Sequence, residues 1–327
     1  MKFSASLAAF FLLASCGLFE PPKSPISWET LTPVHFPSTN FWYQKIASNA
    51  ELDPASQSMI SLLSNTRENS TPYALIGNGG VSVFDTDAKT PRYNVPNTVL
   101  GYEKNGIKNV PIPDYALPAD EQDSHTVFLD KARGYSWEFW QLRILNGRWV
   151  MGTSAVYDLA GPGVIPQSSG RASGFSLLGG LIWPQELLAT NIPHALVFVF
   201  HTKKGNPVWP ALHSDGPYTD EASMPMGTHI QLDPALELTN LGLDIYQIAI
   251  GKALQEYGAY LGDTGSFALK CVSPRSYSTD PYESIPSYDK SAKIISLSKI
   301  PANRFRVLKL GTAQSNNNTI SHPELYY

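Results

Sequence analysis

Residues 194–202 (HALVFVFHT) constrain the fold of this chain more than any other segment. Side chains alternate between the two faces of a strand, and in the middle of this segment both faces are apolar. A strand of this kind is covered on both sides, so we expect it in the centre of a sheet that lies between other layers. The sequence therefore predicts a layered fold built around this strand.

Short strands and frequent turns are predicted along most of the chain. Aromatic residues make up 11% of the sequence, which also contains 24 Gly and 26 Pro, and this composition favours short strands joined by turns. Two hairpins are expected, one around residues 77–80 and one around residues 131–134. Further strands are expected at residues 149–157, 259–261 and 305–310. We predict a mainly β fold, a β-sandwich or jelly-roll-like domain with one or two packed α-helices.

Apolar residues at helical spacing predict where those helices lie. The clearest helix covers residues 244–257, because its apolar side chains form one stripe and Gly258 is a natural end. Another begins at Asp53, with Pro54 in the first turn, and continues to residue 63. A weaker helix is expected over residues 291–297.

The N-terminus carries the sequence Leu13-Ala14-Ser15-Cys16, preceded by an apolar run. It resembles the lipobox of a bacterial lipoprotein signal peptide. The resemblance implies a signal peptide at residues 1–15 and lipidation of Cys16, and hence a lipid-anchored protein of the cell envelope. Gly17 is not the Asp that retains such proteins in the inner membrane, so the outer membrane is favoured in a Gram-negative cell. With Cys16 acylated, Cys271 has no partner for an intrachain disulfide.

The remainder of the chain is predicted to form one domain. Residues 16–30 form a Pro-rich tether, residues 31–313 a single β-rich domain, and residues 314–327 a polar, loose C-terminal tail. The formal net charge of −4 argues against a nucleic-acid partner. No P-loop or dinucleotide-binding glycine motif is present, so no nucleotide partner is expected.

The candidate catalytic residues are Asp123, His125 and Glu138. On a regular strand Asp123 and His125 share a face, where they suit a general base with its orienting partner or half of a metal site. The alternative is that both satisfy backbone groups at the mouth of a strand. Glu138 lies beside Trp140, and a buried carboxyl of this kind has a raised pKa and suits a general acid. The alternative is an ordinary ion pair with Arg143 or Arg148.

Candidate ligand-binding residues are aromatic or lie in loops. Trp137 and Trp140 flank Glu138 and offer surfaces on which a sugar ring can stack. Trp209 and His213 belong to a loop rich in aromatic and Pro residues, which suits the mouth of a binding site. The alternative is an ordinary packed surface loop.

A divalent metal ion is the cofactor that the sequence could hold. His125, His194 and His213 could provide its ligands if the strand ends converge, and the alternative is three separate strand-end histidines. The Asp263-Thr264-Gly265 triplet resembles part of an aspartic protease motif, but one copy in a chain of this length indicates a turn.

Several segments between residues 120 and 265 resemble a group of secreted β-rich bacterial proteins. The matching residues are Asp123-x-His125-x4-Asp130, His194-Ala195-Leu196, Pro210-Ala211-x-His213, Pro225-Met226-Gly227 and Ala253-Leu254-x-x-Tyr257-Gly258-Ala259-Tyr260-x-x-Asp263. The resemblance implies one domain through all of them and groups the three histidines, but it implies no particular activity.

Three functions fit these observations. The first is a lipid-anchored envelope protein whose β-rich domain binds a polysaccharide, with or without cleaving it. The second is a non-catalytic structural or adhesive envelope lipoprotein. The third is a metal-dependent enzyme that uses the three histidines.

Overall fold

The computed structural model describes the chain over residues 26–34, 36–65, 71–77, 79–98, 106–119, 122–167, 170–316 and 318–327. Cys16 and the predicted signal peptide lie outside the described residues. No helix in these stretches is long and apolar enough to cross a membrane.

The larger sheet has eight strands in the order β14-β15-β1-β13-β10-β12-β11-β16. It contains both parallel and antiparallel pairs. The strands are β1 (Tyr73–Leu75), β10 (Leu196–Phe200), β11 (His229–Leu232), β12 (Ala259–Thr264), β13 (Ala268–Lys270), β14 (Tyr288–Asp289), β15 (Ile294–Ser296) and β16 (Phe305–Val307). β10 lies inside this sheet with every residue buried, which confirms the prediction made from its two apolar faces.

Three α-helices pack around this sheet: α1 (Ser56–Asn65), α2 (Pro184–Leu188) and α3 (Ile245–Glu256). The predicted helix 244–257 is confirmed as α3, with Asp244 as its N-cap in a capping box. Gly258 follows with a φ of 72°, a conformation that glycine adopts without strain. The helix predicted to begin at Asp53 is confirmed as α1.

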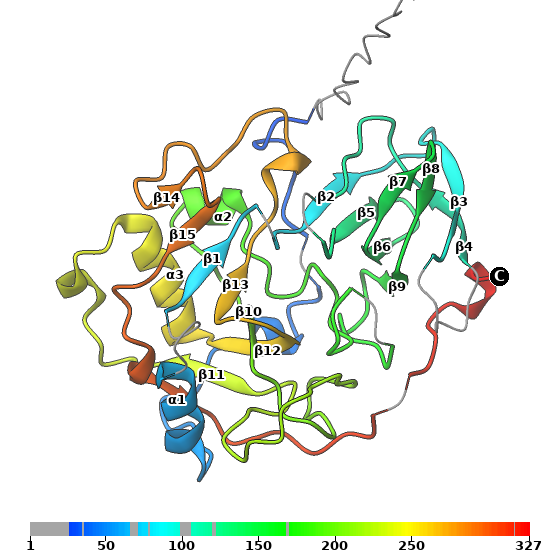
Figure 1. The fold of residues 1–327 in the computed structure, drawn as a ribbon. Helices are drawn as coiled ribbons and strands as arrows, with labels where there is room; N and C mark the ends of the chain where they lie inside the picture. Colours follow the sequence, from blue (N-terminus) through cyan, green and yellow to red (C-terminus); the bar gives the residue numbers. More distant parts are fainter. Residues whose placement is uncertain are drawn as a thin grey trace, which may run out of the picture.

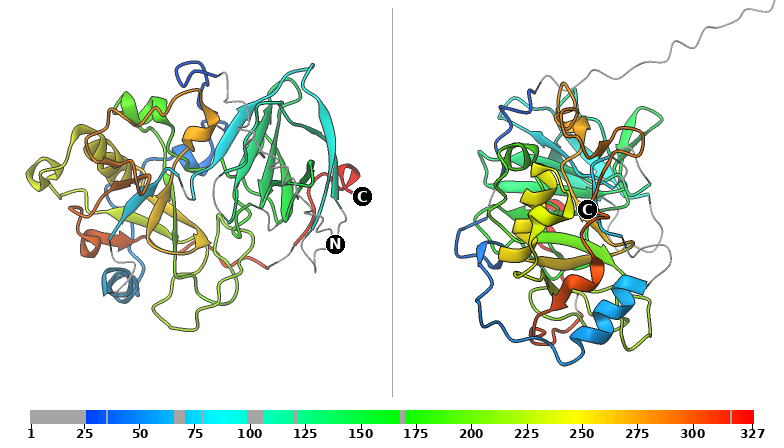
Figure 2. Two further views of the ribbon diagram at one scale, coloured as in Figure 1. Left: turned by 45° about the horizontal axis from the view of Figure 1, so that its top comes forward. Right: turned by 90° about the vertical axis from the view of Figure 1, so that its left-hand side faces the viewer.

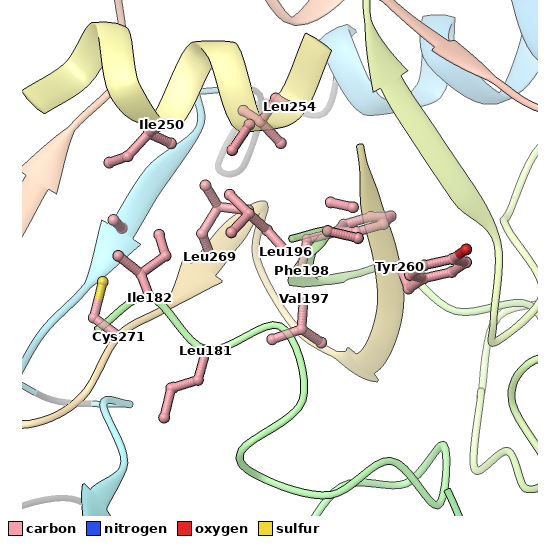
Figure 3. Packing of buried hydrophobic residues seen from close by; sticks show 14 of the residues in the cluster. Leu181, Ile182, Leu196, Val197, Phe198, Ile250, Leu254, Tyr260, Leu269 and Cys271 are labelled. Atoms are coloured by element: carbon pink, nitrogen blue, oxygen red, sulfur yellow. The ribbon is translucent and has the colours of Figure 1, made fainter. Parts of the chain in front are cut away.

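Helix α3 covers one face of the larger sheet. Figure 3 shows Ile250 and Leu254 of the helix above Leu196 and Leu269 of the sheet, whereas Val197 points away from the helix. The larger sheet therefore has one face that packs against α3 and an opposite face to which the side chain of Val197 belongs.

The smaller sheet has four strands in the order β2-β5-β6-β9. Two ribbons lie beside it, β3–β4 and β7–β8. The bounds are β2 (Ser82–Asp85), β3 (Arg92–Pro96), β4 (Gly106–Pro111), β5 (Thr126–Asp130), β6 (Tyr135–Trp140), β7 (Arg143–Leu145), β8 (Arg148–Val150) and β9 (Thr153–Asp158). β5 and β6 form the antiparallel hairpin predicted around residues 131–134. The strand predicted at residues 149–157 is divided between β8 and β9.

The two sheets lie on opposite sides of the molecule (Figures 1 and 2). The mainly β class is confirmed, and the arrangement is sandwich-like. Short 3₁₀-helices complete the fold: Phe41–Tyr43, Leu238–Leu241, Pro274–Ser276, Ala302–Arg304 and Pro323–Leu325.

Two sequence predictions are wrong. β1 and β2 were expected to form a hairpin, but they pair in different sheets, so the chain passes from one sheet to the other between Leu75 and Ser82. The weak helix at residues 291–297 is instead strand β15, which pairs with β1 and β14. Ile294 and Ile295 are β-branched, and such residues fit a strand better than a short helix.

Buried apolar side chains form two clusters that share the smaller sheet. Val83 and Val127 point into the large cluster, whereas Phe84 and Phe128 point into the small one. Tyr326 is buried in the small cluster and donates to the Ser154 carbonyl, so the end of the polar tail packs against the protein.

Candidate functional site

Charged side chains of the larger sheet lie on the face away from α3. Leu269 contacts the helix side, so the next residue, Lys270, points to the opposite side. Asp263 pairs with Val199, which shares the face of Val197. Lys270 and Asp263 therefore point into the same space from β13 and β12, with β10 between them.

A β-bulge gives Asp263 this orientation. The register of β10 and β12 shifts between Phe198 and Val199, which leaves Gly262 as an extra residue. With regular pairing, Asp263 would lie opposite Phe200 and point towards α3. A Cβ at Gly262 would lie 2.5 Å from Val197 Cγ2, so the bulge needs a residue without a side chain.

His125 and Glu138 belong to the opposite wall, the smaller sheet. Val127 pairs with Glu138 and points into the large cluster, and His125 precedes Val127 by two residues on the same face. Backbone hydrogen bonds link the two sheets here, because the Ser82 amide donates to the His125 carbonyl and the Val81 amide donates to the Cys271 carbonyl. This chain of contacts brings His125 near β13.

Four neighbouring groups affect the ionisation of Asp263. Burial and the carboxylate of Asp215 raise its pKa to about 6, against the lowering effect of His125, of Lys270 and of a hydrogen bond from the Thr264 amide. Asp215 is exposed and its Oδ1 lies 3.4 Å from the Thr264 hydroxyl. The Asp263 site is defined by Asp263, Asp215, His125 and Lys270, of which His125 and Lys270 are buried and Asp215 is exposed.

Lys270 lies on the same face of the larger sheet as Asp263. The residue is 8% exposed, and its Nζ is not among the buried polar atoms that lack a hydrogen-bond partner. Its charge lowers the pKa of Asp263, although the two groups form no ion pair.

Glu138 lies deeper and is fully enclosed. It accepts hydrogen bonds from the Ser136 hydroxyl (2.8 Å), the Ser176 hydroxyl (2.5 Å) and the Leu177 amide (2.6 Å). Burial raises its pKa to about 7, against the lowering effect of these bonds and of Arg171. The predicted rise of its pKa is confirmed, but its cationic neighbour is Arg171 rather than either arginine expected from the sequence.

Arg171 holds the loop that covers Glu138. Its guanidinium is buried and donates to the carbonyls of Ser176, Leu177 and Gly179. Burial lowers its pKa to about 10. Because every one of these contacts is internal, Arg171 and Glu138 brace the structure between the sheets.

Asp123 does not share the face of His125. Ser124 has a φ of 43°, which interrupts the regular alternation before β5 begins. Asp123 is consequently exposed and accepts a hydrogen bond from Trp140 Nε1 at 3.0 Å. Trp137 is 2% exposed and packs in the small cluster, where no ligand reaches it.

The structure does not bring the three predicted metal ligands together. His194 is buried before β10, where its Nε2 lies 3.0 Å from Glu186. His213 Nδ1 lies 2.9 Å from the Ala172 carbonyl, in the loop next to Asp215. No group of three His, Cys, Asp or Glu side chains in the described part of the chain is placed to hold a metal ion.

Trp209 lines a separate groove of about 500 Å³. Its side chain is 45% exposed, and its ring lies 6.2 Å from that of Phe41 at an angle of 69°. The described lining residues carry no charge; they are Pro37, Thr39, Asn40, Phe41, Gln44, Ala160, Gly161, Pro162 and Trp209. Of the sequence-predicted binding residues, Trp209 is the most exposed tryptophan.

No family model, curated protein or solved structure matches this chain.

Sequence reasoning singled out His125 but did not group Lys270, Asp215 or Asp263 with it. The Asp263 triplet was interpreted as a turn because it did not fit a protease. A polar Lys270 between the apolar Leu269 and Cys271 is the one signal that could have drawn attention to this strand.

Proposed function

We propose that this protein is a lipid-anchored cell-envelope protein whose β-rich domain binds a polysaccharide. The observation that carries the proposal is the half-exposed indole of Trp209 in an uncharged groove. Sugar rings present a flat face of C–H groups, which packs well against an aromatic face that is already held in place.

Polar groups around Trp209 suit the hydroxyls of a sugar. Thr39 and Gln44 are exposed at the groove, where they offer a hydroxyl and an amide. Asn40 Nδ2 donates to the Pro162 carbonyl at 2.6 Å and ties the two walls together. The site thus combines a stacking surface with neutral hydrogen-bonding groups, the usual composition of a small polar-ligand site.

The N-terminal motif supports the same function, because a lipid on Cys16 would keep the domain beside the polysaccharides of the envelope. Metabolic labelling with a palmitate analogue tests this part of the proposal. Wild-type protein should incorporate the label and Cys16→Ser should not; equal labelling of the two would contradict it.

Binding is tested by isothermal titration of the purified chain with a panel of neutral and acidic polysaccharides. Trp209→Ala should weaken binding about tenfold, which corresponds to about 1.4 kcal/mol and lies in the range of one stacking contact. Tyr218→Ala is the matched control, since Tyr218 is 37% exposed and lies outside the groove. Absence of binding to every polymer, or equal affinity of wild type and Trp209→Ala, would overturn the proposal.

A further inference from the structure

We infer that the β7–β8 ribbon inserts its tip into the surface of a membrane that contains anionic phospholipids. The inference goes beyond the proposed function, because it concerns neither the Trp209 groove nor a sugar. Its starting point is a run of exposed residues, 143–148, which makes up almost the whole of this ribbon (Figure 1).

The tip of the ribbon is a tight turn with a defined shape. Leu145 pairs with Arg148, and Asn146 and Gly147 connect them with φ values of 51° and 74°. Positive φ at both central positions belongs to the type I′ turn, which matches the twist of the flanking strands. The local sequence therefore fixes a narrow tip on an arm of three residues, about 10 Å long.

Both faces of the tip carry an exposed aliphatic side chain. Ile144 is 55% exposed and Leu145 is 53% exposed, and no other large hydrophobic residues exposed in the described chain are adjacent in sequence. Neighbouring strand residues point to opposite faces, so Ile144 shares a face with Trp149 and Leu145 shares a face with Arg148. A protein groove that covered one face would leave the other in water, whereas lipid surrounds an inserted tip on both faces.

The charge of the ribbon selects an anionic lipid surface. Arg143 and Arg148 are exposed and form no ion pair with any described residue; Arg143 reaches only Gln141 Oε1, at 3.5 Å. Residues 139–157 contain no Asp or Glu, and neither does β3, which lies against β8. The chain as a whole has a net charge of −4, so this positive tip is a local feature. Long arginine side chains can hold their charge at lipid phosphates while Leu145 enters the apolar layer.

The length of the ribbon fits a shallow insertion. An arm of about 10 Å matches the burial of about 5–10 Å that is typical of segments at a membrane interface, and it is far too short to cross a core of about 30 Å. In Figure 1 the described chain begins in the upper part of the molecule, where β7 and β8 also lie. A membrane that meets the ribbon is therefore on the side where the domain begins.

The experiment places an environment-sensitive fluorophore on Leu145→Cys in the full chain. Cys16→Ser removes a second thiol, and Cys271 is fully buried. Vesicles that contain phosphatidylglycerol should shift the emission to the blue, and brominated acyl chains should quench it. Vesicles of phosphatidylcholine alone should do so far less. Replacing both arginines (Arg143→Gln and Arg148→Gln) should raise the lipid concentration required about tenfold or more.

Ile245→Cys with the same label is the matched control. Ile245 is apolar and 60% exposed, but it follows Asp244 and has no basic neighbour in sequence, so its emission should not change. The urea midpoints of all variants should equal that of wild type, because every substituted residue of the ribbon is exposed. An unchanged emission at position 145, an equal change at position 245, or a response that ignores lipid charge and both arginines would overturn the inference. So would a blue shift that grows with protein concentration without vesicles, which would assign the tip to a second copy of the chain.

Discussion

Replacing Glu138 by Gln tests whether burial, rather than pairing with Arg171, controls the ionisation of this carboxyl. Burial raises its pKa from an ordinary 4.5 to about 7. The folded protein thus binds the proton more tightly than the unfolded chain. Protonation of Glu138 consequently contributes stability that is fully present below pH 4.5 and is lost as the pH rises through about 7.

The magnitude follows from linkage at about 1.4 kcal/mol per pKa unit. Between about pH 5 and about pH 8, wild type should lose about 2.5 kcal/mol of unfolding free energy through Glu138 alone. Gln does not titrate, and its side chain can retain the local contacts. Its carbonyl can accept from the Leu177 amide, and its NH₂ can donate to the hydroxyls of Ser136 and Ser176.

Urea unfolding at a series of pH values measures the effect. The stability of Glu138→Gln relative to wild type should improve by about 2.5 kcal/mol from the acid to the alkaline end. Glu51→Gln, at an exposed carboxylate, is the matched control and should leave the profile nearly parallel to wild type. Burial also raises the pKa of Asp263, to about 6, but Asp263 is present in both proteins, so the difference between their profiles reports Glu138. Parallel profiles for Glu138→Gln and wild type would refute the reasoning, because they would mean that the folded protein holds Glu138 ionised beside Arg171 throughout.

Other changes test the packing around the same region. Arg171→Met should lower the unfolding free energy by about 3–5 kcal/mol in urea titrations, because it leaves three carbonyls and Glu138 without their cation; a loss under about 1 kcal/mol would contradict the bracing role. Cys271 is fully buried and burial raises the pKa of its thiol, so a thiol reagent should label it only after unfolding. Rapid labelling of the folded protein would disagree with the position of Cys271. Gly262→Val should cost about 1–3 kcal/mol by overpacking against Val197, as measured by the denaturant midpoint, whereas unchanged stability would argue against the bulge.

Local sequence patterns predicted those helices and strands whose apolar residues coincide with the faces that are buried in the structure. The strand at residues 194–202 is apolar on both faces and is found buried inside the larger sheet. Helix α3 has its N-cap at Asp244 and ends before Gly258, so the local sequence determines both of its ends. Periodicity and capping are short-range properties, and a single sequence reveals them directly.

Pairing between distant segments could not be predicted in the same way. Residues 77–80 have the glycine content of a hairpin turn, but β1 pairs with β13, which lies near residue 269. Residues 291–297 have weak helical spacing, and the free edge of β1 decides in favour of a strand. In both places the structure depends on pairing with a strand that lies almost two hundred or more residues away. Nothing in the local sequence identifies that strand.

The Asp263 site shows why sequence reasoning can group a residue with the wrong neighbours. His125 was expected to act with Asp123, because the two alternate along one strand, but the left-handed Ser124 separates them. Asp263 is the acid on the side of His125, and two non-local features place it there: the contact between the sheets and the bulge at Gly262. Removal of that one extra residue would rotate Asp263 to the α3 face, where an unpaired carboxylate would be buried among apolar side chains. The bulge therefore orients Asp263 and is also required for stability. Without the bulge, a chain that kept Asp263 would have to bury this carboxyl in its neutral form or would lose its folded structure.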